Sequence, residues 1–547
     1  MTTAAGGVFE AIKAAIGADA VDNSDATRDH YARSTGGFAT RPAMVCYPTS
    51  TEQVQAVVRA VQGMDTVLYP ISGGCNWGYG DACAPTEGAV IMDLGRMNRI
   101  LEVDTDLAYC VIEPGVSQGQ LYKHLQDNNT GLWMDSTAAG LKASLMGNTV
   151  DRGFGHTRYA DHYLTSCGFE IVLADGRVLQ TGFAHYENAH AKYVYRHGVG
   201  PALDGLFTQS NFGIVTRIAL WLMPEPEEFA FFYFRAPEKE ALGPIIDALR
   251  PLRLHGTLQT AVHVGNDMRL LAAARQYPWE ETGGTTPMPP EVRKKLRDDL
   301  SAGCWTASGS LAGSKALVRE GKQKLRSALK GLGKIRFAND QTLAILKNSS
   351  RLLGFTKWGK DWAYKLGTLG PNYGMLKGIP TDEPLRGSQW RVRGAKHAAP
   401  QDPRDTNAGV LWLAPVMPAR GRDARAVHDI VEPIFLRNGL DPLMTFTTIN
   451  ERSLVAILNA AFDRTVPEEQ EGAHRWYDEA STALIEAGYI PYRASPQTMP
   501  KLRPEGDVYW DVATAIKKTL DPQDILSRGR YIPPLNGANG PEDDAHE

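Results

Sequence analysis

The sequence predicts an α+β protein of at least two domains. Its 547 residues are too many for one hydrophobic core. A strand, a helix and a second strand alternate within the first seventy residues, and this mixing continues along the chain. Closely spaced prolines at Met223-Pro224-Glu225-Pro226 then separate two regions of different texture. We therefore place domains at residues 1–226 and 227–490, with residues 491–547 returning to the first domain.

Periodicity predicts the elements of the first domain. Apolar residues recur at helical spacing after Ser50 and Thr51, which are good helix caps. Asp175-Gly176 is a hairpin turn signal between two short strands. These patterns predict two α/β lobes, with helices at 8–16, 52–61 and 118–126 and strands at 43–48, 66–69, 89–94, 109–114, 169–173, 178–181 and 214–222.

In the second domain, the predicted strands and helices alternate in an α+β pattern. We expect a loop at 279–290, which is rich in glycine, threonine and proline. The patterns predict helices at 242–249 and 470–487 and strands at 229–234, 409–415 and 444–447.

Composition excludes several classes of protein. Hydrophobic residues make up 43% and charged residues 22%, as in ordinary globular proteins. The net charge of -4 and the lack of a basic cluster predict no nucleic-acid binding. No apolar run is long enough for a membrane span, and no export signal is recognisable, so we expect a cytoplasmic protein. Six scattered cysteines without zinc spacing predict reduced thiols and no metal site.

A glycine-rich turn, Pro70-Ile71-Ser72-Gly73-Gly74-Cys75-Asn76-Trp77-Gly78-Tyr79-Gly80, follows a short buried strand. Its four glycines fall within eight residues. Glycine permits positive φ and close approach of backbone N–H groups, and successive N–H groups in such a turn bind anions such as a pyrophosphate. The turn is neither a GxGxxG nor a Walker loop. Taken alone, it is equally consistent with an ordinary turn.

Five further segments follow the turn in a fixed order, namely Glu113-Pro114-Gly115-Val116, Leu132-Trp133-Met134-Asp135, Met146-Gly147-Asn148-Thr149-Val150-Asp151-Arg152-Gly153, residues 168–176 and Gly213-Ile214-Val215-Thr216. Together they resemble the vanillyl-alcohol oxidase and p-cresol methylhydroxylase flavoproteins over nearly the whole chain. The resemblance implies a two-lobed FAD-binding domain of the p-cresol methylhydroxylase type at 1–226. It also implies a substrate-binding cap with an antiparallel sheet at 227–490.

The same resemblance implies FAD as cofactor and a set of residues that bind it. We expect Asp151 and Arg152 to pair and to shape the turn beneath the flavin. The implied cofactor-binding residues are Ile71, Ser72, Gly73, Gly74, Cys75, Asn76, Gly78, Gly147, Asn148, Asp151, Arg152, Gly153, Gly213, Ile214, Val215 and Arg528.

Tyr79, Tyr492 and Arg493 match the positions that bind the phenolic oxygen in this family. Two O–H donors and a permanently charged guanidinium around one oxygen favour the phenolate. A dry pocket beside the flavin would then protect an electron-poor quinone methide. The resemblance thus assigns these three residues to catalysis, whereas a buried aromatic and a strand-end pair is the structural alternative.

The sequence departs from the family at the covalent flavin link. Val410 stands at the position of the flavin-linking histidine and cannot form that bond. His397 and Cys75 are other candidate attachment points, although we favour an exposed loop histidine for the first and a packed thiol for the second. We therefore predict that FAD is bound non-covalently.

A second departure concerns the acid or base near the benzylic carbon. Ala138 and Thr445 occupy the positions where the two branches of the family carry a carboxylate. His156 stands where family members have an active-site tyrosine, and a histidine there could move a proton. A structural histidine bonded to the backbone is the other interpretation.

Taken together, these features predict an FAD-dependent oxidoreductase that removes a hydride from the benzylic carbon of a para-substituted phenol through a quinone methide. Oxygen or an electron-transfer protein such as cytochrome c would accept the electrons, and we expect a homodimer or higher homo-oligomer. Two alternatives stay open. One is an enzyme of the same fold that acts on a non-phenolic alcohol or sugar, and the other is a flavin-binding subunit without its own turnover.

Overall fold

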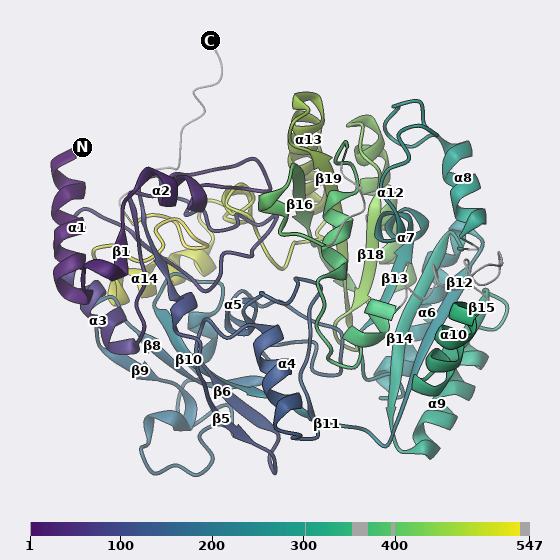
Figure 1. The fold of residues 1–547 in the computed structure, drawn as a ribbon, viewed down its shortest axis with the longest axis horizontal. Helices are drawn as coiled ribbons and strands as arrows, with labels where there is room; N and C mark the ends of the chain where they lie inside the picture. The colour runs from purple at the N-terminus through teal and green to yellow at the C-terminus, as the bar shows by residue number, and fades with distance from the viewer. Residues whose placement is uncertain (1, 301, 353–369, 395–399, 536–547) are drawn as a thin grey trace.

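The computed structural model describes residues 2–300, 302–352, 370–394 and 400–535. Figure 1 shows two parts side by side. The part on the left, called the N-terminal part below, holds a four-stranded sheet, a five-stranded sheet, the short pair β7–β11 (Leu132–Trp133 and Met223–Pro224) and the yellow C-terminal residues. The part on the right, called the cap, is built on one large sheet. Among the described residues, no helix has both the length and the apolar content that a bilayer span requires.

The first lobe of the N-terminal part is a four-stranded sheet in the order β1-β2-β4-β3. The strands β2 and β3 both pair with β4 in parallel, as expected for an α/β unit. Ser50 accepts a hydrogen bond from the backbone of Gln53 (3.3 Å) and so begins the crossover helix α3. The elements are α1 (Thr2–Ile16), β1 (Val21–Asp22), α2 (Asp25–Tyr31), β2 (Met44–Cys46), α3 (Thr51–Ala60), β3 (Leu68–Ile71) and β4 (Val90–Asp93).

The second lobe is a five-stranded sheet in the order β5-β6-β10-β8-β9. All neighbouring strands in it are antiparallel, which differs from the α/β unit that the sequence suggested. A hairpin joins β8 to β9, as Asp175-Gly176 predicted. The elements are β5 (Ile100–Asp104), β6 (Tyr109–Ile112), α4 (Gln118–Asp127), β7 (Leu132–Trp133), α5 (Leu145–Val150), β8 (Ser166–Val172), β9 (Val178–Gln180), β10 (Ile214–Trp221) and β11 (Met223–Pro224).

The C-terminal segment packs on both lobes. Side chains of α14 (Val508–Leu520) join the core of the second lobe. The backbone of Ser527 then donates to Leu68 of the first lobe (2.9 Å). The C-terminal residues therefore stand beside the glycine-rich turn, which follows β3.

The cap sheet is antiparallel, as the family resemblance implied. It has eight strands, seven of them in the order β15-β12-β14-β13-β18-β19-β16, while β17 also pairs with β19. The strands are β12 (Glu228–Ala236), β13 (Val262–Asn266), β14 (Trp305–Gly313), β15 (Lys334–Ala338), β16 (Ala408–Leu413), β17 (Val416–Pro418), β18 (Leu443–Thr448) and β19 (Ser453–Asp463).

Helices cover one face of the cap sheet and form the largest core with it. Side chains alternate across a strand, so Val262 and Val264 join this core while His263 and Gly265 lie on the opposite face. We call that opposite face the inner face. The helices of the cap are α6 (Leu242–Leu254), α7 (Asp267–Ala274), α8 (Pro290–Asp299), α9 (Lys315–Ala328), α10 (Asp340–Leu352), α12 (Gly421–Arg437) and α13 (Pro467–Glu486).

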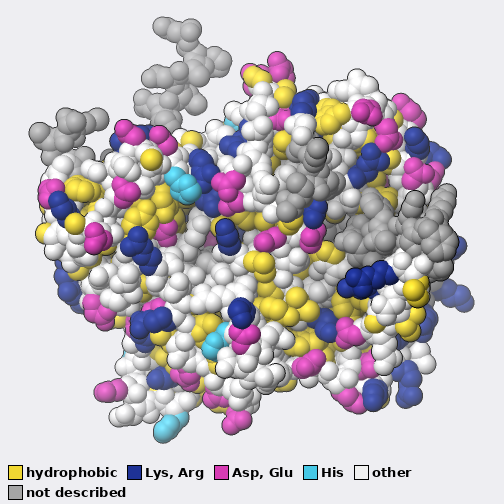
Figure 2. Space-filling model, in the orientation of Figure 1, with side chains coloured by type: hydrophobic (Ala, Val, Ile, Leu, Met, Phe, Trp, Pro, Cys, Tyr) yellow, Lys and Arg dark blue, Asp and Glu magenta, His cyan; other side chains and the backbone are white. Residues whose placement is uncertain are grey.

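Charges of both signs are interspersed over the face of the molecule drawn in Figure 2. This face carries no extended basic surface of the kind that binds nucleic acid.

Candidate active site

A cavity of about 380 Å³ lies between the glycine-rich turn, α5 and the C-terminal residues. Both lobes contribute to its walls, and Trp412 adds a side chain from the cap. Among the residues predicted to bind the cofactor, those that line the cavity are Ile71, Ser72, Gly73, Gly74, Cys75, Asn76, Gly147, Asn148, Asp151, Gly213, Ile214 and Val215.

The glycine-rich turn has the features of an anion site. The backbone N–H groups of Gly73, Gly74, Cys75 and Asn76 make no hydrogen bond within the described part of the chain. Gly74 has a φ of 63°, a conformation that L side chains rarely adopt. Such a row of free donors along a cavity wall fits the pyrophosphate of FAD.

Glycine is also required where the walls meet. A Cβ on Gly147 would lie 2.4 Å from the Oγ of Ser72. A Cβ on Gly78 would lie 2.3 Å from the Cδ1 of Trp412. Gly78 thus brings the cap against the turn instead of lining the cavity itself. Gly153 likewise serves packing, because a Cβ there would lie 2.2 Å from the Oδ1 of Asn148.

Two predicted cofactor residues point elsewhere. Arg152 donates to the Oγ1 of Thr208 (2.9 Å), so the predicted pair between Arg152 and Asp151 does not form. Arg528 faces Asp524, with its Nε 3.5 Å from the Oδ2, and does not line the cavity. Arg530, two residues further on, takes the cavity position.

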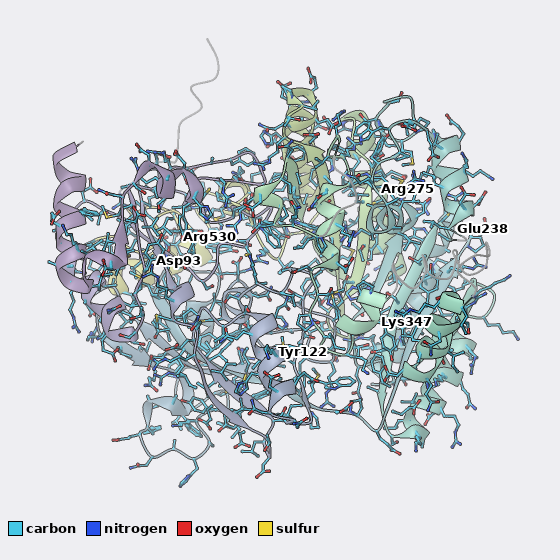
Figure 3. All side chains as sticks on the ribbon, viewed as in Figure 1. Asp93, Tyr122, Glu238, Arg275, Lys347 and Arg530 are labelled. Atoms are coloured by element: carbon cyan, nitrogen blue, oxygen red, sulfur yellow. The ribbon has the colours of Figure 1, made fainter. Side chains whose placement is uncertain are left out.

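Asp151 is the centre of a buried charge network. One of its oxygens contacts both the Nε and the Nη2 of Arg493 (2.5 Å each). The other accepts from the hydroxyl of Tyr531 (2.9 Å) and lies 3.4 Å from the Nη2 of Arg530, which Figure 3 labels inside the N-terminal part. Burial raises the pKa of Asp151, but the two guanidinium groups outweigh it and hold that pKa below its ordinary value.

The three residues predicted to bind the phenolic oxygen come together. The guanidinium carbon of Arg493 lies 4.8 Å from the centre of the Tyr79 ring. Its Nη2 donates to the Oδ1 of Asn76 (2.9 Å). Burial raises the pKa of Tyr79 and of Tyr492, so both phenol groups keep their protons at neutral pH. Tyr79 and Arg493 line the cavity, whereas Tyr492 stands behind it with its ring 5.6 Å from that of Phe154.

His156 does not line the cavity. Its Nδ1 lies 2.9 Å from the carbonyl oxygen of Ser136. A carbonyl only accepts, so Nδ1 carries the proton and Nε2 keeps its lone pair. Burial lowers the pKa of His156, which keeps the ring neutral. The ring packs against His263 of β13, with centroids 4.6 Å apart, at the junction with the cap.

The candidate attachment points for the flavin differ in chemistry. Val410 is buried on β16. Burial raises the pKa of the Cys75 thiol to about 11, so the thiolate that would attack a flavin is scarce at neutral pH. His397 lies outside the described residues. Non-covalent binding of FAD stays a prediction, and the protonated thiol of Cys75 favours it.

Several residues of the site carried no sequence signal that we used. His162 lies between the Oδ1 of Asn148 (2.6 Å) and the Oδ2 of Asp135 (2.5 Å), and so fixes a cavity residue. His263, Arg269 and Trp412 come from the cap. A polar residue on an otherwise apolar strand is the signal that could have found His263, whereas no such pattern marks Arg269 on α7 or Trp412 on β16.

Comparison with known proteins agrees with this geometry. Residues 42–182 match a family model described as an FAD binding domain. The flavoprotein subunit of 4-cresol dehydrogenase (hydroxylating) from Pseudomonas putida is 30% identical over 90% of this chain and 88% of its own. The chain belongs to the p-cresol methylhydroxylase family.

Two further relatives are similarly close. The 1'-carboxy-chondrochloren decarboxylase of Chondromyces crocatus is 35% identical over 91% of this chain and 92% of its own. The 4-ethylphenol oxidase of Gulosibacter chungangensis, solved with isoeugenol, superposes with a TM-score of 0.88 and is 30% identical, with 98% of each chain covered. As a p-cresol methylhydroxylase family member, this chain is an FAD-linked oxidoreductase, and FAD is its cofactor.

Proposed function

We propose that this enzyme oxidises a para-substituted phenol at its benzylic carbon. The substrate would be a 4-alkylphenol, a 4-hydroxybenzyl alcohol or a lignin-derived phenol. The observation that carries the proposal is the convergence of Tyr79 and Arg493 on one end of the cofactor cavity, with Tyr492 beside them. Two relatives are named for para-alkylphenols, which supports the same substrate class.

The residues would act mainly by stabilising the phenolate. Arg493 stays charged because Asp151 outweighs the effect of burial on its pKa. The Tyr79 hydroxyl makes no hydrogen bond to a described residue, so it is free to donate to a substrate oxygen. Charged and O–H donors aimed at a developing oxyanion lower the barrier most in a site that excludes water. Bound FAD would supply the hydride acceptor, held by the turn at 73–76, by α5 and by residues 213–215.

The test is rapid-mixing reduction of the flavin by 4-ethylphenol under anaerobic conditions. We expect Tyr492→Phe and Arg493→Lys to slow reduction by about one to two decades, because each loses a hydrogen bond to a charged oxygen worth roughly 1.5–3 kcal/mol. Both variants should keep their FAD. Reduction at the wild-type rate in both would exclude these residues from the substrate site.

Oxidative decarboxylation is the second candidate function. It is supported by the relative named as a decarboxylase and by the absence of a carboxylate at Ala138 and Thr445. After hydride loss from the benzylic carbon, cleavage of a neighbouring C–CO₂ bond supplies the electron pair for a new double bond, and no base is needed. Release of one CO₂ per flavin reduced would favour this reaction, whereas a hydroxylated or ketone product without CO₂ would favour simple oxidation.

We also propose that oxygen or an electron-transfer protein such as cytochrome c reoxidises the enzyme, and that it is a homo-oligomer. Reoxidation of the reduced protein by air within one turnover time would identify an oxidase. Slow reaction with air but fast reaction with cytochrome c would identify a dehydrogenase.

A further inference from the structure

Arg269 is a half-buried arginine without an anionic partner on the inner face of the cap sheet. It is the third residue of α7, where its backbone N–H donates to the Oδ1 of the capping residue Asn266 (3.0 Å). Its guanidinium makes no hydrogen bond and no ion pair to residues 2–300, 302–352, 370–394 or 400–535. The guanidinium lies over Trp412, whose ring centre is 5.7 Å from the guanidinium carbon.

Nearby arginines of the cap are paired. Asp267 binds Arg293 (2.6 Å) and Arg297 (3.0 Å), and Asp441 binds Arg391 (2.7 Å). Without such a partner, burial lowers the pKa of Arg269. A desolvated guanidinium costs free energy unless an anion pairs with it. The fold therefore retains a positive charge that no described residue neutralises.

The surroundings connect Arg269 to the proposed substrate site. A Cβ on Gly265 would lie 3.6 Å from the Oγ1 of Thr445 and 3.8 Å from the Cγ of Arg269, so that hydroxyl and the arginine stem meet over this glycine. Trp412 lines the cofactor cavity and also closes against Gly78, the residue before Tyr79. The guanidinium does not itself line the cavity, but through Trp412 it adjoins the cap side of the cavity that holds the phenol-binding residues.

The balance of charge in the site favours an anionic side chain on the substrate. Asp151 already compensates Arg493 at the phenol end. At the cap end, Thr445 and Ala138 supply no carboxylate. We propose that Arg269 binds a carboxylate on the para side chain of the substrate. This proposal rests on the function proposed above and makes 4-hydroxyphenyl acids its preferred substrates, because a guanidinium fork pairs best with a planar carboxylate.

The test compares 3-(4-hydroxyphenyl)propanoate with its primary amide, which has the same shape and no charge. Binding to the FAD-loaded enzyme is followed by the change in the visible flavin spectrum. We expect the wild type to prefer the acid by at least about tenfold, and Arg269→Met to remove that preference by weakening acid binding about 10- to 100-fold. Arg275→Met is the matched control, because Arg275 follows the same helix and pairs with Glu281 (2.8 Å). It should keep the preference.

Equal binding of acid and amide by the wild type, or a preserved preference in Arg269→Met, would overturn the carboxylate site. Arg269→Lys gives a second test if the methionine variant folds poorly. Lysine keeps the charge but loses the planar fork. We therefore expect Arg269→Lys to bind the acid more tightly than the amide, but by a smaller ratio than the wild type does. An unchanged ratio would count against the site. Reduction rates separate the two proposals. If the acid is preferred but no phenol reduces the flavin, the carboxylate site stands and the proposed function fails. If 4-ethylphenol reduces the flavin and the acid binds no more tightly than the amide, the proposed function stands and the carboxylate site fails.

Discussion

Replacing Asp151 by Asn should destabilise the protein through the two buried guanidinium groups around it. Arg493 contacts one carboxylate oxygen through two nitrogens at 2.5 Å, and Arg530 lies 3.4 Å from the other. Removing one partner of a buried ion pair costs about 3–5 kcal/mol. For a chain of 547 residues, whose unfolding entropy is about 1.1 kcal/mol/K, that corresponds to a fall in the thermal midpoint of roughly 3–4 °C.

The assay is thermal unfolding of the FAD-loaded protein. Asp175→Asn is the control, because its carboxylate lies on an exposed hairpin and pairs with Arg177 at 2.6 Å. An exposed pair contributes about 0–1 kcal/mol, so this variant should unfold near the wild type. The lowered pKa of Asp151 adds a pH signature. Its contribution is complete above the unfolded pKa of about 3.9 and is lost as the pH falls through the folded value, so the deficit of Asp151→Asn should be constant near neutral pH. Equal midpoints for the two variants would refute this account of the network.

Three other predictions follow from the site. Acid or heat should release most of the flavin into solution, because Val410 cannot link it, and flavin that stays with the precipitated protein would contradict this. His156→Phe should leave hydride transfer intact. It should slow the later proton transfer by about two to four decades, or change the product. Unchanged reduction and product distribution would make His156 structural. Burial lowers the pKa of both His156 and His263, so the unfolded chain takes up protons that the folded chain excludes, and stability should fall below about pH 6.5. In the double variant His156→Phe, His263→Phe, the free energy of unfolding should decrease less as the pH falls below about 6.5. Chemical denaturation at several pH values would measure this.

Local signals explain how far the sequence predicted the fold. The cap at Ser50, the Asp175-Gly176 hairpin and the apolar periods gave elements that the structure contains, often within a few residues. Strand direction was harder. The second lobe is antiparallel, and a pattern of apolar residues does not report which neighbour a strand takes.

The site divides in the same way. The turn at 70–80 is one continuous segment, and Tyr492 and Arg493 are neighbours in the chain. Most of these residues line the cavity or lie beside it. Arg152 and Arg528 were assigned by proximity in sequence, but their side chains bind Thr208 and Asp524. Side-chain direction at a turn depends on backbone geometry, and Arg152 has a φ of 51° that no sequence pattern announced.

Residues from the cap were the most difficult to foresee. Arg269 and Trp412 lie 143 positions apart in the chain and meet because α7, which carries Arg269, directly follows β13, and β13 belongs to the same sheet as β16. His263 meets His156 across the junction between the two parts of the molecule. Such contacts follow from the packing of distant segments, which single-sequence periodicity does not encode.

Anaerobic titration of the yellow protein with 4-ethylphenol and with its methyl ether, 4-ethylanisole, tests the proposed function most directly. The two compounds share the benzylic carbon, but the ether cannot form a phenolate for Tyr79, Tyr492 and Arg493 to stabilise. The account predicts that the phenol bleaches the flavin stoichiometrically and that the ether does not. Bleaching by both compounds, or by a non-phenolic alcohol and neither of them, would contradict it.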